Sequence, residues 1–125
     1  MFIIYIMKSY KQLNCFDDRK KESDSILSKY EDRVPIILEK MDNVSTTLPD
    51  LDKNKYLVPR ELNMSQFCHV VRKRMKLPPE QALFFFVAGN KMIQGQKVIG
   101  KVYDEESDPD GFMYITCSSE NTFGF

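Results

Sequence analysis

The feature that most constrains the fold is a capped amphipathic segment in the middle of the chain, at residues 63–75. Asn63 can cap a helix that begins at Met64, and Gln66 at its third position completes a variant of the capping box. The apolar side chains that follow recur every three to four residues, which predicts one stripe buried against a core. That stripe consists of Met64, Phe67, Cys68, Val70, Val71 and Met75. Basic residues fill the last turns, where they complement the helix dipole, and two prolines then end the helix.

A helix with one buried side needs a partner surface, and short strand patterns lie on both sides of it in the sequence. Residues 82–88 are continuously apolar, as expected of a strand buried on both faces or nearly so. Three further runs have the β-branched or alternating pattern of strands, namely residues 34–38, 56–59 and 113–117. Pro35 and Pro59 limit the first two runs, because proline cannot donate to a ladder and must occupy a strand end or an unpaired position.

Helical patterns and one strong turn complete the outline of the chain. A short helix is predicted at residues 9–13 and an amphipathic one at residues 16–29, both ahead of the first strand. Another short helix is predicted at residues 96–103, although Gly100 interrupts it. The Asp-Pro-Asp-Gly sequence at residues 108–111 predicts a turn directly before the last strand.

The order of these elements favours one α+β domain. A four-stranded mixed sheet wrapped over the helix at residues 63–75 buries the apolar surface with the fewest elements. This arrangement is the ubiquitin-like β-grasp roll with an N-terminal helical extension, and another small α+β sandwich also fits the pattern. We assign residues 8–117 to the domain, with the N-terminal helices at about residues 8–29. Residues 1–7 form an unassigned N-terminal extension, and residues 118–125 are predicted to form a flexible C-terminal tail.

The composition excludes several classes of protein. The 18 basic and 18 acidic residues cancel, so no overall field attracts the chain to nucleic acid or anionic membranes. Cys15, Cys68 and Cys117 are odd in number and widely spaced, which argues against a disulfide framework. With the single His69 they fit no familiar spacing of metal ligands. The apolar run at residues 1–7 is too short to span a bilayer and lacks the features of a secretory signal.

The charges cancel over the whole chain but not locally. Residues 53–76 carry seven basic side chains against one acidic side chain, whereas residues 104–110 are strongly acidic. A basic surface beside apolar residues suits a peptide that combines an apolar anchor with carboxylates. The same pattern is also typical of a solvated helix face and a solvated turn, so both interpretations stay open.

Six segments, in the correct order, resemble one protein family. They are residues 29–35, 51–59, 71–74, 82–87, 110–114 and 122–124. The chain resembles the ubiquitin-like modifiers of autophagy, the family of yeast autophagy-related protein eight, the light-chain-three proteins and the GABA-receptor-associated protein. The similarity extends from about Lys8 to Gly124. It implies a cytoplasmic protein without catalysis of its own, which also occupies autophagosomal membranes after lipidation.

The resemblance implies that the C-terminus is processed and then joined to a lipid. A cysteine protease is expected to cleave between Gly124 and Phe125, and activating and conjugating enzymes then pass the exposed carbonyl to phosphatidylethanolamine. Without a Cβ, Gly124 can lie extended in a narrow catalytic groove. The two acyl chains of the lipid give a stable anchor where one chain would not. Apart from this covalent phosphatidylethanolamine, no cofactor is expected.

The resemblance also implies a groove for cargo receptors and adaptors that carry an aromatic-x-x-aliphatic motif, which adds as a strand to the edge at residues 56–59. Its aromatic pocket would be lined by Glu22, Ile26, Pro35, Lys55, Leu57 and Phe112. Its aliphatic pocket would be lined by Tyr56, Val58, Pro59, Leu62, Phe67 and Val70, with basic contacts from Lys53, Arg72 and Arg74. Phe67 and Val70 also belong to the helix stripe, so core packing is the simpler role for both.

Two other functions stay open from the sequence. The first is an unconjugated ubiquitin-like adaptor that binds peptides or the cytoskeleton and does not need Gly124. The second is an enzyme, but adjacent helix positions such as Cys68 and His69 point about 100° apart and do not form a nucleophile and base. The basic cluster at residues 72–74 is too short to predict RNA or tubulin binding by itself. Microtubules therefore stay open as a partner, and nucleic acid is not expected.

Overall fold

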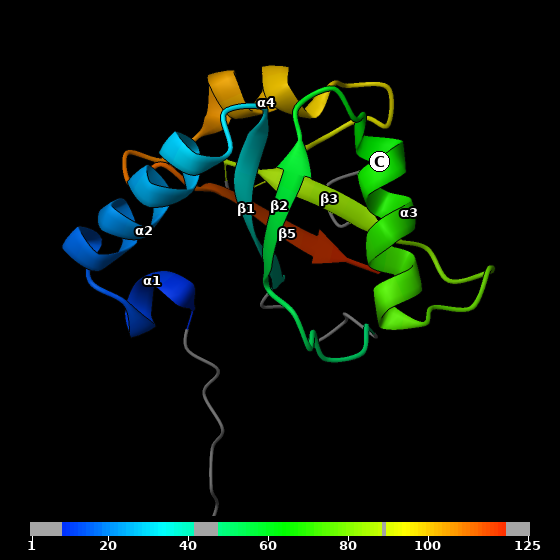
Figure 1. The fold of residues 1–125 in the computed structure, drawn as a ribbon. Coiled ribbons are helices and arrows are strands. Elements are labelled where there is room, and N and C mark those ends of the chain that lie inside the picture. The colour runs from blue at the N-terminus through cyan, green and yellow to red at the C-terminus, as the bar shows by residue number, and fades with distance from the viewer. Residues whose placement is uncertain (1–8, 42–47, 89, 120–125) are drawn as a thin grey trace, which may run out of the picture.

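The computed structural model describes residues 9–41, 48–88 and 90–119. Figure 1 shows how the helices surround the sheet. The elements in chain order are α1 (Tyr10–Leu13), α2 (Phe16–Lys29), β1 (Arg33–Lys40), β2 (Lys55–Pro59), α3 (Met64–Met75), β3 (Phe84–Val87), β4 (Lys91–Met92), α4 (Ile99–Glu106) and β5 (Met113–Ser118). The predicted elements are therefore present in the predicted order.

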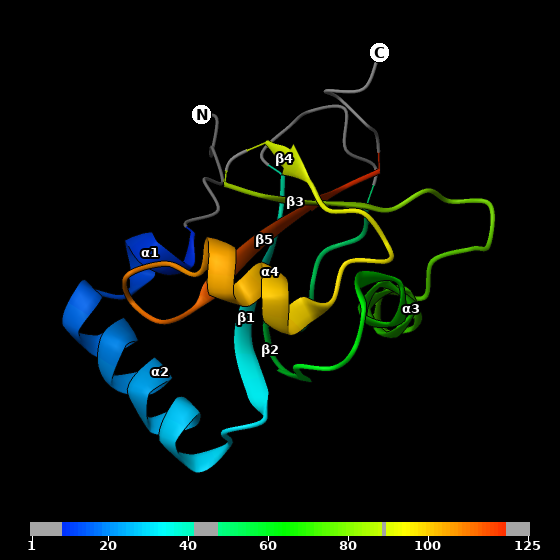
Figure 2. The same ribbon diagram turned by 90° about the horizontal axis from the view of Figure 1, so that it is seen from above.

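The strands in the described part of the chain form one five-stranded mixed sheet in the order β2-β1-β5-β3-β4. The central pair, β1 and β5, is parallel, and the other pairs are antiparallel. Seen from above, α2 and α3 lie on opposite sides of the sheet (Figure 2). This arrangement confirms the predicted roll but corrects the strand number from four to five. The missed strand, β4, is two residues long and exposed, so it has no periodic pattern to detect.

Helix α3 begins and ends where its sequence signals predict. The Asn63 side chain accepts a hydrogen bond from the backbone N–H of Gln66, and the Gln66 side chain accepts one from the Asn63 N–H, both at 2.9 Å. Four members of the predicted stripe are buried against the sheet, namely Met64, Phe67, Val71 and Met75. Cys68 is only partly buried, and Val70 is 49% exposed, so the prediction that Val70 is buried is wrong. Its place on the helix turns its side chain away from the sheet.

A second, smaller core lies on the other face of the sheet and holds the N-terminal helices. Its buried members are Tyr10, Ile37 and Phe112, and Ile26 and Tyr114 pack against them. Tyr10 also donates its backbone N–H to the Glu39 carboxylate at 2.8 Å. The two N-terminal helices are thus attached to the sheet by one aromatic cluster and by polar contacts.

Most element boundaries differ from the sequence prediction by a few residues, and three of the differences have a clear physical reason. Strand β3 begins at Phe84, two residues late, because its partner strand β5 ends opposite Phe84 at Ser118. Helix α4 begins at Ile99, because Val98 is extended and forms a β-bridge with Asn63. Ser118 is in β5 and Ser119 is buried, so the C-terminal tail begins later than residue 118. The rest of that tail, and residues 1–7, lie outside the described residues.

Gly111 holds the turn before β5 in a conformation that favours glycine, with φ at +94°. A Cβ there would overlap the Ser23 hydroxyl and lie 2.8 Å from the Ser23 Cβ. Ser23 is fully buried, so it has no room to move aside. We expect Gly111→Ala to lower the free energy of unfolding by about 2 kcal/mol or more, measured by urea denaturation.

Gly95→Ala provides a matched control for this variant. Its added Cβ would also overlap a serine hydroxyl, that of Ser65, but Ser65 is exposed and can turn aside. Its backbone also lies outside the left-handed region. We expect a loss below about 1 kcal/mol for this variant. Equal losses in the two variants would contradict the strain assigned to Gly111.

Candidate functional site

Strand β2 lies at an edge of the sheet, as predicted. Its only strand partner among the described residues is β1, with which it pairs from Arg33 opposite Pro59 to Ile37 opposite Lys55. The backbone groups on its outer side are therefore directed away from the sheet and can pair with an added strand. An extended peptide could bind here through main-chain hydrogen bonds.

Pro35 is tolerated in β1 although β1 is a central strand. The hydrogen bonds from Leu38 N to Asn54 O and from Arg60 N to Asp32 O show that even-numbered residues of this strand pair with β2. The nitrogen of Pro35 therefore faces the β5 side, where pairing begins only opposite Ile36. The missing N–H falls at an unpaired position, as predicted.

Alternation along β2 divides its side chains between the two faces of the sheet. Tyr56 and Val58 are 6% and 5% exposed and belong to the core under α3. Lys55, Leu57 and Pro59 are half-buried. The predicted split between Leu57 on one side and Tyr56 and Val58 on the other is therefore confirmed.

The structure links the six residues predicted for the aromatic pocket through a chain of contacts. Leu57 lies opposite Pro35, and Lys55 lies opposite Ile37. Lys55 forms an ion pair with Glu22, and Ile26 packs on the cluster that contains Ile37 and Phe112. Pro35 is buried and Phe112 is 0% exposed, so these two form the floor of the region and not its surface.

A polar cluster of Tyr10, Glu22 and Lys55 lies beside these residues. The Tyr10 hydroxyl donates to Glu22 at 2.9 Å, and the Lys55 ammonium lies 5.2 Å from the centre of the Tyr10 ring. Burial of the Glu22 carboxylate acts to raise its pKa, but hydrogen bonds from Lys55 and Tyr10 outweigh this effect and lower the pKa. Burial acts to lower the pKa of Lys55, but its hydrogen bonds with Glu22 and Tyr10 and the charge attraction of these two groups together outweigh burial and raise the pKa. Both groups are therefore held in their charged forms.

The predicted aliphatic pocket is only partly at the surface. Tyr56, Val58 and Phe67 are buried, and the Tyr56 and Phe67 rings pack edge to face with centres 5.4 Å apart. Leu62 is partly buried against the same core, and Val70 is half exposed. Phe67 therefore has the core role that its place in the helix stripe predicted. Of the six residues, only Pro59, Leu62 and Val70 keep appreciable exposure.

The three predicted basic contacts differ in their surroundings. Arg72 donates to the backbone carbonyls of Gln81 at 2.6 Å and Pro78 at 2.9 Å, so it fixes the segment that follows α3. Arg74 forms an exposed ion pair with Asp52 at 3.3 Å. Lys53 is exposed, with its ammonium 4.9 Å from the centre of the Tyr56 ring. Lys53 and Arg74 are thus at the surface, whereas Arg72 is held by the backbone of the segment after α3.

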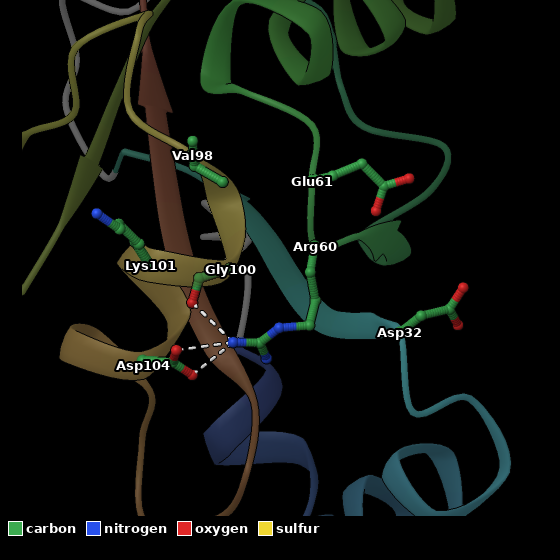
Figure 3. Close-up of a pocket in the computed structure, with 7 residues that line it drawn as sticks. All are labelled: Asp32, Arg60, Glu61, Val98, Gly100, Lys101 and Asp104. Atoms are coloured by element: carbon green, nitrogen blue, oxygen red, sulfur yellow. Dashed lines mark hydrogen bonds and ion pairs between the residues drawn. The ribbon is translucent and has the colours of Figure 1, made fainter.

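The acidic segment at residues 104–110 is not an open patch facing the basic one. Four of its five carboxylates pair with cations from other elements: Asp104 with Arg60, Glu106 with Lys91, Asp108 with Lys11 and Asp110 with Arg19. Figure 3 shows Arg60 reaching from the loop after β2 to α4, where it contacts the Gly100 carbonyl at 3.2 Å and Asp104 at 2.7 and 2.8 Å. A shallow depression surrounds this contact, lined by Asp32, Arg60, Glu61, Val98, Gly100, Lys101 and Asp104.

The described residues contain neither a cluster of metal ligands nor a helix that could cross a bilayer. They contain no group of three or more histidine, cysteine or acidic side chains that could hold a metal ion. In the same residues, no helix is long and apolar enough to cross a bilayer. Burial raises the pKa of the Cys68 thiol, and His69 is exposed, which matches the prediction that Cys68 belongs to the stripe and His69 to the surface.

A mixed five-stranded roll with α3 on one face and two helices preceding β1 defines a ubiquitin-like protein with an N-terminal helical extension. The solved structure of Trypanosoma brucei ATG8 has this fold, with a TM-score of 0.84 at 34% identity, and the match covers 95% of this chain and 100% of that one. A family model described as autophagy protein Atg8 ubiquitin like matches residues 18–124.

Two curated relatives agree with that match. Autophagy-related protein 8 of Candida glabrata is 44% identical over 117 residues, which cover 94% of this chain and 97% of the relative. Autophagy-related protein 8A of Oryza sativa subsp. indica is 47% identical over 116 residues, covering 93% and 95%. The chain therefore belongs to the Atg8 family of autophagy ubiquitin-like proteins, which are modifiers and not enzymes.

The contact between Glu22 and Lys55 leads to a pH prediction. Because the pKa of Glu22 is lowered on folding, its carboxylate stabilises the fold above its unfolded pKa of about 4.3, and this contribution is lost as the pH falls through the folded value. We expect Glu22→Gln to be less stable than the wild type at pH 7. The difference in free energy of unfolding should shrink steadily below about pH 4.

The double variant with Lys55→Met tests whether this pH dependence comes from the contact itself. In the Lys55→Met background, Glu22→Gln should have a smaller effect at pH 7 and a weaker dependence on pH. Urea denaturation from pH 7 to pH 3 measures both quantities. A stability difference that does not change over this range would contradict the assignment.

Proposed function

We propose that the chain is cleaved after Gly124 and conjugated through that glycine to phosphatidylethanolamine on autophagosomal membranes. The observation that carries this proposal is the family match, which includes Gly124 as its last residue. Gly124 and Phe125 lie outside the described residues. The described part of the chain supports the proposal through its likeness to Atg8 proteins over nearly its whole length.

The chemistry needs only the backbone carbonyl of Gly124. A protease thiolate attacks this carbonyl, Phe125 leaves as the amine, and water releases the new carboxylate. An activating enzyme joins this carboxylate to the nucleotide of ATP with release of pyrophosphate, and an enzyme thiolate then displaces AMP to form a thioester, which passes to the conjugating enzyme. The lipid amine then displaces the thiolate and forms an amide. Each buried methylene of the two acyl chains contributes about 0.8 kcal/mol to anchoring, so a protein with no net charge can stay on the membrane.

The partners and location follow from this route. The chain would meet a processing cysteine protease and the activating and conjugating enzymes of the pathway. It would be cytoplasmic before conjugation and bound to autophagosomal membranes afterwards. Cargo receptors and adaptors would then be held at that membrane through the edge of the sheet at β2.

Gly124→Ala tests the conjugation step. In starved cells, we expect the wild type in the membrane fraction to have lost Phe125 and gained one phosphatidylethanolamine, as seen by intact-mass spectrometry. The added Cβ in the variant should block both changes, because the extended backbone has to fit narrow catalytic grooves.

A chain that ends at Gly124 is the matched control, since it needs no cleavage and should still be conjugated. If the wild-type mass stays unchanged under starvation, conjugation is wrong and an unconjugated adaptor is favoured.

We further propose that the edge of β2 binds peptides with an aromatic-x-x-aliphatic motif. Leu57, Lys55, Glu22 and Ile26 surround the position for the aromatic side chain, above the buried Phe112. The position for the aliphatic side chain is bounded by three partly exposed residues, Pro59, Leu62 and Val70. Tyr56, Val58 and Phe67 lie behind them in the core.

The basic residues and the expected affinity agree with such a ligand. The exposed Lys53 and Arg74 would receive acidic residues that flank the motif. Burying one aromatic and one aliphatic side chain contributes roughly 1.5–3 kcal/mol each. After the costs of association, an affinity in the micromolar range, about −8 kcal/mol, is expected.

Leu57→Ala tests this groove. Leu57 is only half-buried on the α2 side of the sheet, so its truncation should not unfold the domain. We expect the dissociation constant of an aromatic-x-x-aliphatic peptide to rise about tenfold, which corresponds to about 1.4 kcal/mol. Isothermal titration calorimetry measures this change.

Leu13→Ala provides the same truncation at a leucine outside both predicted pockets, where the side chain is 66% exposed. This control should bind the peptide as the wild type does. Unchanged affinity in Leu57→Ala would remove Leu57 from the site.

A further inference from the structure

Asp110 is a fully buried carboxylate in the turn before β5, and polar groups from three directions converge on it. Its Oδ2 accepts hydrogen bonds from Arg19 Nη1 at 2.6 Å and from the Tyr114 hydroxyl at 2.5 Å. Its Oδ1 accepts the backbone N–H of Phe112 at 2.8 Å. The backbone carbonyl of Asp110 accepts the hydroxyl of Ser23. Both carboxylate oxygens and the backbone carbonyl of Asp110 therefore accept hydrogen bonds from other groups of the protein.

These contacts join one wall of the proposed aromatic pocket to its floor. Arg19 and Ser23 belong to α2, the helix that also provides Glu22 and Ile26. Phe112, the floor of the pocket, directly precedes β5, and its ring packs edge to face on Tyr10 with centres 5.6 Å apart. One carboxylate thus fixes the position of α2 and the position of the buried aromatic ring beneath it.

A gain in stability does not by itself explain why Arg19 and Asp110 form a buried ion pair. The side chains of Arg19 and Asp110 are 11% and 0% exposed, so both charges have lost most of their water. The desolvation of a buried ion pair can exceed its Coulombic gain, and an apolar pair of similar volume is often as stable. What a carboxylate with several fixed donors provides is one defined geometry.

The attachment of α2 makes this geometry important. In α2 the only fully buried side chain is Ser23, which rests against the turn that contains Asp110. Gly111 permits this close approach, because a Cβ there would overlap the Ser23 hydroxyl. With so little apolar surface buried by α2, its distance from the sheet depends strongly on the polar contacts to Asp110.

We propose that Asp110 is a positioning residue that sets the width of the aromatic pocket and thereby the size of the aromatic side chain that the β2 edge accepts. This inference rests on the proposed peptide docking. Peptide partners are then selected by ring size, with a steep preference between an indole and a phenyl anchor. The charged and exposed residues at the rim contribute to affinity, whereas the buried Asp110 contributes to selectivity.

Asp110→Asn is the main test, because it keeps the side-chain volume and an oxygen that can accept from Phe112. It loses the charge and turns an amide group toward the donors of Arg19 and Tyr114. Two peptides that differ only in tryptophan or phenylalanine at the aromatic position are titrated by calorimetry. In the wild type the two dissociation constants should differ. In Asp110→Asn the ratio of these two constants should be closer to one, by about threefold or more.

Asp104→Asn is the matched control, since it breaks another arginine–aspartate pair, with Arg60, at an exposed place on α4. It should leave the peptide ratio unchanged. Hydrogen exchange gives a readout that needs no peptide: Asp110→Asn should increase exchange of the amides in α2 and of the Phe112 amide, and Asp104→Asn should not. If Asp110→Asn fails to fold, Tyr114→Phe removes one donor to Asp110 and should shift the ratio in the same direction by less.

The outcomes separate this inference from the proposed function. If the wild type binds neither peptide, peptide docking is wrong and the selectivity role falls with it. If the wild type binds both peptides equally, the proposed peptide docking is still supported. The same holds if Asp110→Asn binds both peptides more weakly with an unchanged ratio of dissociation constants. Asp110 is then only a structural residue, and the inference is overturned.

Discussion

The burial of both faces of β1 is the constraint on which the rest of the molecule depends. Val34, Ile36 and Leu38 belong to the large core under α3, whereas Ile37 faces the small aromatic cluster under α2. Alternation along one strand thus builds two cores, one for the ubiquitin-like roll and one for the N-terminal helices. Because β5 pairs with β1 in parallel, its side chains divide in the same way, with Met113 in one core and Tyr114 in the other.

The same alternation divides the edge strand β2 and therefore the candidate groove. On the α3 side, Tyr56 and Val58 continue the core, so a ligand can touch only the residues around them. On the α2 side, Lys55 and Leu57 are half-buried and take part in a polar cluster with Glu22 and Tyr10. The two halves of the groove thus differ physically: one is the edge of a rigid core, and the other depends on how α2 is held.

Local signals predicted the fold well, and long-range polar contacts could not be predicted. The capping box of Asn63 and Gln66, the turn at residues 108–111 and the alternation in β2 gave correct elements because each depends on neighbours in the sequence. The strand β4 and the exposure of Val70 were missed because they depend on where the sheet ends and how α3 is rotated on it. The acidic residues before β5 fit a solvated turn in the sequence, since nothing local shows that Arg19, far away in the chain, pairs with Asp110.

The division between core and groove also decides which residues can report on binding. Truncating Tyr56, Val58 or Phe67 removes buried apolar contacts, which costs several kcal/mol of stability before any ligand is considered. A loss of binding in such variants would therefore mix unfolding with recognition. Leu57 and Val70 keep enough exposure to separate the two effects, one on each side of β2. The roles of the groove and of the core can be distinguished because the pleat of β2 directs neighbouring residues to opposite faces of the sheet.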